Sequence, residues 1–308
     1  MASSESFDTF KGWAIPGPKP VQESPASISG AQGEAGDSGS APQGETGSAA
    51  LSPFEAGPGE SLDSLSGHFK LLQYKAGHRF STDDILVGWY GSSWCPRADR
   101  VLDLGSGIGT VSTVCAWRLP GAKLVTIEAQ DISVKLARRS VARNGLEGRV
   151  DIREFDFRDE KALAEDERFD LITGSPPYFP LGTGVLAEHP QKVACRFEVR
   201  GSVHDYCQVA SRHLAPGGVF TAIFPYVQAD RVRDAMREAG MTMVRARPIV
   251  FREGEEPLMW LFLGMKAEHL PESMRGKCWD EPALIIRAKD GSIHPEYRAV
   301  KLAIGFPP

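Results

Sequence analysis

The stretch Val101-Leu-Asp-Leu-Gly-Ser-Gly-Ile-Gly-Thr110 decides the fold of this chain. It begins as a short apolar strand and continues into a run in which every second residue is glycine. Glycine has no Cβ, so the backbone of such a turn can approach a ligand closely. Parallel strands of open α/β sheets bind ligands beyond their carboxyl ends. The pattern therefore predicts that Asp103, Gly105 and Gly107 lie at a ligand pocket.

Apolar strands alternate with helices after this turn. The expected strands of the main sheet cover residues 101–104, 123–127, 150–155, 169–173, 219–224, 241–251 and 258–265. The first expected helix is capped by Thr82 or Asp83 and runs through Trp89. Four further helices are expected at residues 110–119, 132–143, 203–214 and 229–239. This alternation predicts an α/β fold with a seven-stranded, mostly parallel sheet and helices on both faces. The last two strands have no helix between them, which predicts an antiparallel hairpin at one edge.

Smaller elements are expected outside this core. Residues 69–74 are expected to form a strand before the first helix, and residues 284–287 an extra strand near the end. A polar turn and a short apolar end should follow that last strand.

The composition divides the chain at residue 60. Residues 1–60 are rich in Gly, Ser and Pro and carry eight acidic side chains against two basic ones. With few large apolar side chains, this stretch cannot offset the entropy of ordering it, so we predict a disordered acidic tail. Phe7, Phe10 and Trp13 leave open a short docking motif within it. Residues 61–308 are predicted to form one domain.

Charge, cysteines and hydropathy exclude several classes of protein. The net charge is −5, and the five cysteines are widely spaced without a C-x-x-C pair. This predicts reduced thiols, with neither a disulfide framework nor a bound metal. No apolar stretch is long enough to span a bilayer, and the first residues do not resemble a secretory signal. We therefore expect a cytoplasmic protein without a membrane contact.

The ends of the first three strands of the main sheet predict a site for S-adenosylmethionine. Asp103 is placed to accept from the ammonium group, and Glu128, about twenty residues after the glycine turn, to accept from both ribose hydroxyls. Ala129 follows at the same strand end. After the third strand, Asp156 suits the adenine amino group, and Phe155 or Phe157 suits the adenine ring. The turn is D-x-G-x-G and no arginine follows Glu128, which favours this cofactor over a dinucleotide.

The fourth strand of the main sheet ends in Ser175-Pro-Pro-Tyr178. Two prolines keep this backbone out of a sheet ladder, so the Pro176 carbonyl can face a ligand. An amine on an aromatic ring is a weak nucleophile because its lone pair is delocalised. Hydrogen bonds to the Ser175 side chain and the Pro176 carbonyl would draw its nitrogen towards tetrahedral geometry. Tyr178 would stack on the base. We predict Ser175, Pro176, Pro177 and Tyr178 as the catalytic loop.

With these motifs the chain resembles the amino-methyltransferases that carry Asn, Asp or Ser before Pro-Pro-Tyr/Phe. Among them it is most similar to the bacterial tRNA adenine-N6 methyltransferases that modify the adenine just 3′ of the anticodon in a valine tRNA. The resemblance runs from about Ser61 to Phe306. Besides the two motifs, it rests on Gly77-His-Arg-Phe-Ser-Thr-Asp-Asp-Ile-Leu86, Cys195-Arg-Phe-Glu198, Ala283–Arg287 and Tyr297–Phe306.

The resemblance implies a Rossmann-like class I methyltransferase that acts on adenine N6 in tRNA. In that family, the segment before the first strand of the sheet covers the methionine end of S-adenosylmethionine. The matching segment of this chain contains Phe80 and Thr82, so the resemblance implies that these two residues contact the cofactor. Arg196, which matches a family element, and Lys192 are predicted to bind RNA phosphates. The other basic residues near the acceptor loop that could do so are Arg200, Arg245 and Arg247. We expect a monomer. The family usually has Asn where this chain has Ser175, and its members lack the sixty-residue tail.

Three other functions remain open from the sequence. A protein glutamine amide is also a planar nitrogen and is methylated through a similar Pro-Pro-Tyr loop. The lack of a separate RNA-binding domain leaves a small-molecule acceptor open. A non-catalytic subunit that only binds the cofactor is the third, although the intact Asp103, Glu128 and acceptor loop count against it. The sequence does not identify the tRNA, the nucleotide or the role of the tail.

Overall fold

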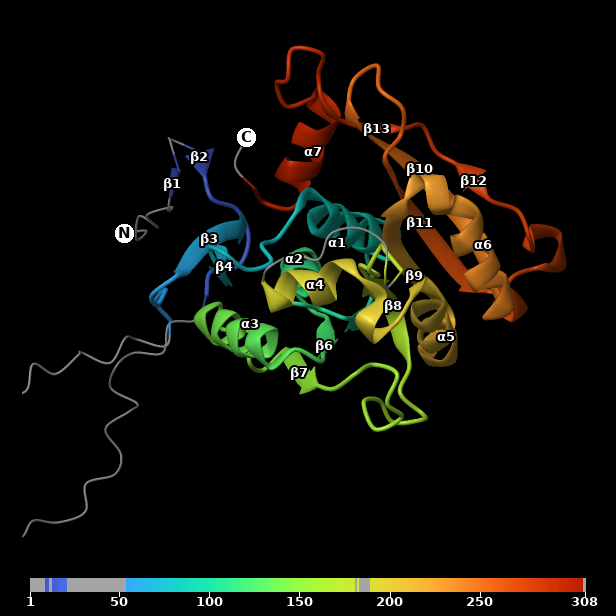
Figure 1. The fold of residues 1–308 in the computed structure, drawn as a ribbon, viewed down its shortest axis with the longest axis horizontal. Coiled ribbons are helices and arrows are strands. Elements are labelled where there is room, and N and C mark those ends of the chain that lie inside the picture. The colour runs from blue at the N-terminus through green and yellow to red at the C-terminus, as the bar shows by residue number, and fades with distance from the viewer. Residues whose placement is uncertain (1–8, 11–12, 21–53, 181, 183–188, 307–308) are drawn as a thin grey trace, which may run out of the picture.

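The computed structural model describes residues 9–10, 13–20, 54–180, 182 and 189–306. Within these residues the centre of the molecule is a nine-stranded sheet (Figure 1). The strands follow the order β12-β10-β11-β9-β8-β5-β6-β7, and β13 also pairs with β10. This is the α/β architecture that the alternation of strands and helices predicted.

The seven strands predicted for the main sheet are all present. Five run parallel to one another: β5 (Arg100–Leu104), β6 (Lys123–Glu128), β7 (Val150–Glu154), β8 (Phe169–Gly174) and β9 (Leu214–Pro225). The antiparallel hairpin consists of β10 (Met241–Arg252) and β11 (Met259–Lys266). Because β11 pairs with β9, the hairpin continues the sheet on the side away from β7.

The prediction that this hairpin forms the edge of a seven-stranded sheet was wrong. β12 (Trp279–Asp280) and β13 (Leu284–Arg287) both pair in parallel with β10 and cover its free side. Leu284 and Ile286 are buried there, so apolar burial explains why the chain returns to β10. The extra strand at 284–287 is confirmed, but its position beside β10 was not foreseen.

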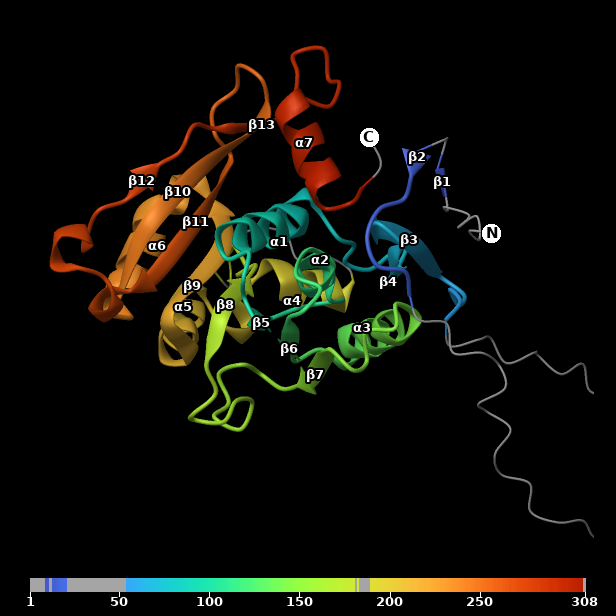
Figure 2. The same cartoon turned by 180° about the vertical axis from the view of Figure 1, so that it is seen from behind.

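Side chains of successive strand residues enter two different cores. In β5, Val101 packs into the core on one face and Leu102 into the core on the other, as the twofold repeat of a strand requires. The first core includes α1 (Thr82–Trp94), α2 (Thr110–Arg118), α3 (Asp131–Arg143) and α7 (Pro295–Ala303). The second includes α5 (Val203–His213) and α6 (Ala229–Glu238). Figures 1 and 2 show these two helix layers from opposite sides.

Two helices begin with the same hydrogen-bonded cap. Ser81 precedes α1, and its backbone N–H and hydroxyl both donate to Asp84 Oδ2. Ser202 precedes α5 and donates in the same way to Asp205 Oδ2. Such a capping box satisfies helix N–H groups that have no partner inside the helix. The cap of α1 is therefore Ser81, one residue before Thr82 and two before Asp83, the two predicted caps.

Three elements of the structure were not expected from the sequence, namely α4 (Pro190–Arg196), α7 and β3 (Glu60–Ser66). Helix α4 lies between the acceptor loop and α5, and α7 replaces the expected apolar end. Strand β3 pairs with β4 (Phe69–Tyr74), which was predicted at these residues. Short helices have weak periodicity, so the apolar pattern of α4 and α7 is difficult to distinguish from that of a loop.

Part of the predicted tail is described and packs against the domain. Strands β1 (Thr9–Phe10) and β2 (Trp13–Ala14) form a small hairpin, which lies near the C-terminal end of the chain in Figure 1. Gly17 lies against the Trp117 side chain, and Glu60 is already the first residue of β3. These segments lie within the stretch for which we predict a disordered tail, and that tail stays a prediction. Residues 1–8, 11–12 and 21–53 of the predicted tail, including Phe7, lie outside the described residues, and the division at residue 60 stays a prediction.

Candidate active site

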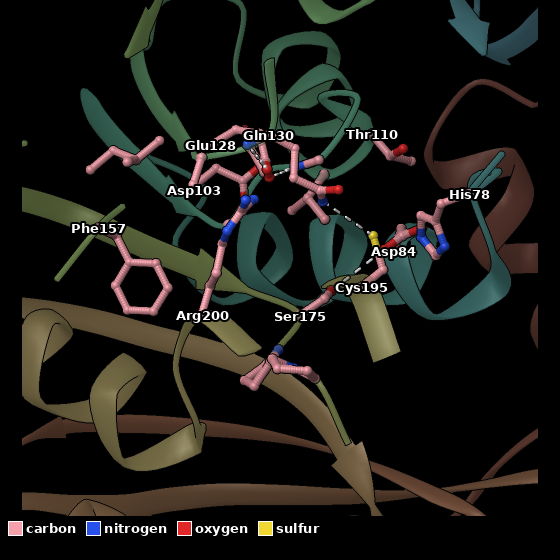
Figure 3. A pocket seen from close by; sticks show the side chains of 18 of the residues that line it. His78, Asp84, Asp103, Thr110, Glu128, Gln130, Phe157, Ser175, Cys195 and Arg200 are labelled. Atoms are coloured by element: carbon pink, nitrogen blue, oxygen red, sulfur yellow. Dashed lines mark hydrogen bonds between the residues drawn. The ribbon is translucent and has the colours of Figure 1, made fainter. Parts of the chain in front are cut away.

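A cavity of about 490 Å³ opens at the carboxyl ends of β5, β6 and β8 (Figure 3). Most of the residues predicted from the sequence line it: Asp103, Gly105, Gly107, Glu128, Ala129, Asp156, Phe157, Ser175, Pro176, Pro177, Tyr178 and Arg196. They come from segments up to 93 positions apart, and the parallel strands bring them to one edge of the sheet. Their roles stay predictions, but their placement in one cavity is a finding.

Tyr206 lies so close to the glycine turn that one position of the turn has no room for a side chain. Gly105 has φ +61°, which favours glycine, and a Cβ at this position would collide with the Tyr206 hydroxyl. Tyr206 is buried in α5, and its ring packs edge-on against Phe157 at a centroid distance of 4.5 Å. Its closeness explains the need for glycine: a side chain here would displace a buried tyrosine that itself lines the cavity.

Asp103 is almost fully buried and already has two donors. Its Oδ1 accepts from the Thr173 hydroxyl at 2.8 Å, and its Oδ2 accepts from the Ser112 N–H at 3.1 Å. Burial raises the pKa of Asp103 to about 7, against the opposing effect of these hydrogen bonds. A cation bound next to this carboxylate would stabilise its ionised form, because the attraction between the two charges would offset the cost of burial.

Glu128 is also buried, at the end of β6. Its Oε2 accepts from the Gly107 N–H at 2.8 Å and its Oε1 from the Gln130 N–H at 2.7 Å. Burial raises the pKa of Glu128, opposed by these backbone donors and by the charge of Arg200. Figure 3 shows Arg200 extending from the far side of the cavity toward Glu128. The bonds to Gly107 and Gln130 fix the carboxylate and leave it lone pairs for further donors.

Asp156 lies in the cavity but is engaged by its own neighbour. Both of its carboxylate oxygens accept from the Arg158 guanidinium, at 2.9 and 2.6 Å. The Arg158 hydrogen bonds hold the pKa of Asp156 below its usual value. The carboxylate is therefore ionised but shared, and an adenine amino group would compete with Arg158 for it. This competition was not visible in the sequence.

The acceptor loop is tied to the first turn of α1 by two carboxylates. Tyr178 donates its hydroxyl proton to Asp83 Oδ2 at 2.9 Å, and Ser175 donates to Asp84 Oδ1 at 3.5 Å. Burial raises the pKa of Asp83 to about 6. The Tyr178 ring meets Phe224 edge-on at 5.6 Å. These contacts fix both ends of the loop.

Backbone contacts support the same loop from the other side. The Tyr178 N–H donates to the Arg196 carbonyl at 3.1 Å, and the Gln228 side-chain amide donates to the Tyr178 carbonyl at 3.0 Å. Helix α4, which carries Arg196, is held by the buried Gln191. Its Oε1 accepts from the His78 N–H at 2.8 Å, and its Nε2 donates to the Ser133 hydroxyl at 2.9 Å. A chain of hydrogen bonds thus fixes the position of α4 beside the cavity.

Three residues predicted at the site do not line the cavity. Phe80 is partly buried and packs against the first core, and its N–H donates to Gln73 Oε1 at 3.0 Å. Thr82 is the first residue of α1 and is not among the lining residues. Their neighbours Ser81, Asp83 and Asp84 line the cavity instead. Lys192 is half-buried on α4 and outside the lining, whereas Arg196, one turn further on, is exposed and belongs to it.

Arg200, one of the basic residues expected near the acceptor loop, lines the cavity, whereas several other lining residues were not predicted at the site from the sequence: Asp83, Asp84, Gln130, Cys195 and Tyr206. The two aspartates stand within the segment from Gly77 to Leu86, where their adjacency to the cap was the available signal. Tyr206 comes from the middle of an amphipathic helix, where a tyrosine is indistinguishable from an ordinary core residue. Among the described residues, no cluster of His, Cys, Asp or Glu has the arrangement of a metal site. The described part of the chain also holds no helix that is both long and apolar enough to cross a bilayer.

Comparison with known proteins places these features in a family. A tRNA1(Val) (adenine(37)-N6)-methyltransferase from Bacteroides thetaiotaomicron is 27% identical over 190 residues, which are 61% of this chain and 77% of that protein. The enzyme of the same name from Aeromonas salmonicida is 30% identical over 183 residues, 58% of this chain and 72% of that protein. The chain belongs to the tRNA1(Val) (adenine(37)-N6)-methyltransferase family.

Two further comparisons agree with membership of this methyltransferase family. The model of the methyltransferase small domain matches residues 92–224, which run from the end of α1 to β9. A crystal structure of a predicted O-methyltransferase from Agrobacterium tumefaciens superposes with a TM-score of 0.54 at 18% identity, covering 73% of this chain and 98% of that one. That likeness bears on the class I methyltransferase fold alone.

Proposed function

We propose that this protein transfers a methyl group from S-adenosylmethionine to the N6 amine of an adenine in tRNA. The observation that carries the proposal is the meeting, in one cavity, of the glycine turn with Asp103 and Glu128 on one side and the Ser175–Tyr178 loop on the other. Family membership supports tRNA as the acceptor, because the relatives are named for adenine 37 of a valine tRNA.

The residues present fit S-adenosylmethionine. Ser106, in the glycine turn, has a buried hydroxyl without a hydrogen-bond partner among the described residues, and it lines the cavity. An unpaired buried hydroxyl is costly, so a polar ligand at the turn would stabilise it. Asp103 would hold the ammonium group and Glu128 the ribose hydroxyls, while Phe155, which is 40% exposed, offers an apolar surface at the adenine end.

The chain's own residues account for orientation of the acceptor. Bound S-adenosylmethionine supplies an electrophilic methyl group. Ser175 and the Pro176 carbonyl accept from the two N–H groups of the amine, which leaves its lone pair free for the methyl carbon. The Tyr178 ring stacks on the base, and its bond to Asp83 fixes the ring plane. No strong base is required, because the aminium proton can leave to water after transfer.

Binding of the tRNA backbone falls to exposed cations around the mouth of the cavity. Arg196 and Arg200 are exposed and line it. Phosphate contacts of this kind supply most of the affinity for nucleic acid and little of the sequence choice. We propose that the protein acts in the cytoplasm, where its tRNA substrate is found.

Parallel methylation assays with three classes of acceptor test the proposal. The purified chain is incubated with methyl-labelled S-adenosylmethionine and, in parallel, with total tRNA, a protein extract and a nucleoside mixture. We expect label in the tRNA, removed by ribonuclease and resistant to protease. Label in protein would indicate a glutamine amide acceptor, label in free nucleoside a small-molecule enzyme, and S-adenosylmethionine binding without transfer a non-catalytic subunit. Each of these results would overturn the proposal.

A further inference from the structure

Asp84 divides its two carboxylate oxygens between two tasks. Its Oδ2 caps α1 by accepting from the Ser81 N–H at 2.9 Å and from the Ser81 hydroxyl at 3.2 Å. Its Oδ1 accepts from the Ser175 hydroxyl at 3.5 Å. Asp84 and Ser175 both line the cavity, and Figure 3 shows their side chains directed toward one another.

A cap alone does not require the second oxygen. The matched capping box of α5 satisfies the Ser202 N–H at 2.7 Å and the Ser202 hydroxyl at 2.9 Å with Asp205 Oδ2 alone. Asp205 does not line the cavity. The contact of Asp84 with Ser175 is therefore additional to capping, and it joins the residue to the acceptor loop.

The chemistry of serine explains what this contact supplies. A hydroxyl carries one proton and two lone pairs, and it rotates freely. If its proton turned toward an incoming amine, it would donate to the nitrogen lone pair that must remain free for reaction. A carboxylate has acceptor sites only. By taking the Ser175 proton, Asp84 leaves the serine oxygen to present lone pairs to the cavity.

We propose that Asp84 is a positioning residue that turns Ser175 into an acceptor for the substrate amine. The proposal rests on the proposed function and deepens it. An asparagine in place of Ser175, usual in the family this chain resembles, has an amide oxygen of its own and needs no such partner. In this chain, Ser175 and Asp84 together perform the task of that amide oxygen.

A double-mutant cycle tests the proposal on the full chain. Asp84→Asn is made in the parent and in the Ser175→Asn background, and kcat, the KM for tRNA and the S-adenosylmethionine Kd are measured. In the parent we expect kcat to fall about tenfold, the value of one hydrogen bond to a charged group, with KM and Kd changed less than about twofold. In the Ser175→Asn background the same change should alter kcat by less than about twofold, because the asparagine supplies its own oxygen.

Two further variants separate positioning from capping. Asp205→Asn removes the equivalent cap carboxylate from α5 and should leave kcat near that of the parent. Asp84→Glu retains a capping box, for which Glu is a usual residue, but lengthens the arm. It should still lower kcat in the parent and have little effect beside Ser175→Asn, so the cycle stays informative if Asp84→Asn folds poorly.

The outcomes distinguish this proposal from the one on which it rests. If the parent does not methylate tRNA, the proposed function is wrong and the role of Asp84 falls with it. If the parent is active but the Asp84 variants lose the same fraction of kcat in both backgrounds, the residue is structural and the positioning role is overturned. A loss of kcat in Asp205→Asn as large as in Asp84→Asn would also overturn it.

Discussion

The Tyr178 hydroxyl donates to Asp83 Oδ2 at 2.9 Å, although the two residues lie 95 positions apart in the sequence. This bond joins the acceptor loop after β8 to the first turn of α1. The Phe224 ring supports the tyrosine from the side. The orientation of the predicted stacking surface therefore depends on a segment that precedes the main sheet.

Tyr178→Ala and Tyr178→Phe should separate stacking from this hydrogen bond. Loss of an aromatic stacking surface costs roughly 1–3 kcal/mol per base, so we expect Tyr178→Ala to lower kcat/KM for tRNA by about tenfold or more. Tyr178→Phe keeps the ring and loses only its bond to Asp83, so its effect should be smaller. Calorimetry should give nearly unchanged S-adenosylmethionine affinity for both. If the two variants are equally active on tRNA, the tyrosine does not stack on the acceptor.

The affinity for S-adenosylmethionine should depend on the charge of Asp103. Its pKa of about 7 lies above that of an exposed aspartate, so in the free protein the carboxyl is largely protonated at pH 6 and largely ionised at pH 7.5. Only the ionised form attracts the ligand's ammonium group. We expect Kd to tighten by roughly fivefold from pH 6 to pH 7.5, because the carboxylate becomes ionised while an α-amino group, with a pKa of about 7.7–8.0, stays mostly protonated.

Asp103→Asn is the control for this pH dependence. The amide keeps the shape of the side chain and has no charge to titrate. Affinity should be weaker than in the parent at pH 7.5 and nearly constant over the same interval. A parent Kd that does not change with pH, or an asparagine variant that keeps the parental slope, would show that another group controls binding.

The N-terminal segment and the C-terminal turn meet at Trp117, and Gly305 should be sensitive there. Gly305 has φ +75°, and its Cβ would lie 2.8 Å from the Gly67 backbone nitrogen and also collide with Trp117. Gly291 has a similar φ of +85° with open space around it. Alanine at either position incurs backbone strain of about 1–2 kcal/mol, but only Gly305→Ala adds a collision. Urea unfolding should show that Gly305→Ala lowers the free energy of unfolding clearly more than Gly291→Ala does. Equal decreases for the two variants would mean that the structure around Trp117 can accommodate the added Cβ.

Arg196 should contribute to tRNA affinity without affecting the cofactor. We expect Arg196→Ala to raise the KM for tRNA and to reduce the slope of log Kd against log salt by about one, as loss of one phosphate contact does. Arg97 is a suitable control, because it is exposed in the turn before β5, at the opposite end of the sheet from the cavity. A KM for Arg196→Ala no higher than that for Arg97→Ala would remove Arg196 from the RNA-binding surface.

The sequence predicted the strands of the main sheet and the cofactor side of the cavity well. Both depend on local patterns: an apolar strand, then a glycine turn or an acidic residue at its end. Asp103 and Glu128 could be located this way because parallel strands place such residues at one edge. The edge position of the hairpin was predicted wrongly, since nothing local indicates that residues 284–287 pair with β10.

The acceptor side could be predicted only in part. The Ser175–Tyr178 loop is a visible motif, but its partners Asp83 and Asp84 resemble ordinary acidic residues in the first turn of a helix. Phe80 was assigned to the cofactor by resemblance, whereas in the structure its side chain is partly buried and packs against the core. Arg158 is only two residues from Asp156, yet its hydrogen bonds to that carboxylate depend on side-chain conformations that no pattern encodes.

The position of the transferred methyl group decides whether this protein is an adenine-N6 methyltransferase. The protein is incubated with tRNA and S-adenosylmethionine that carries a trideuterated methyl group, and the tRNA is digested to nucleosides for mass spectrometry. We predict a single labelled product, adenosine with the heavy methyl group on N6. A heavy methyl group on a ribose, on a ring carbon or on another base would contradict it.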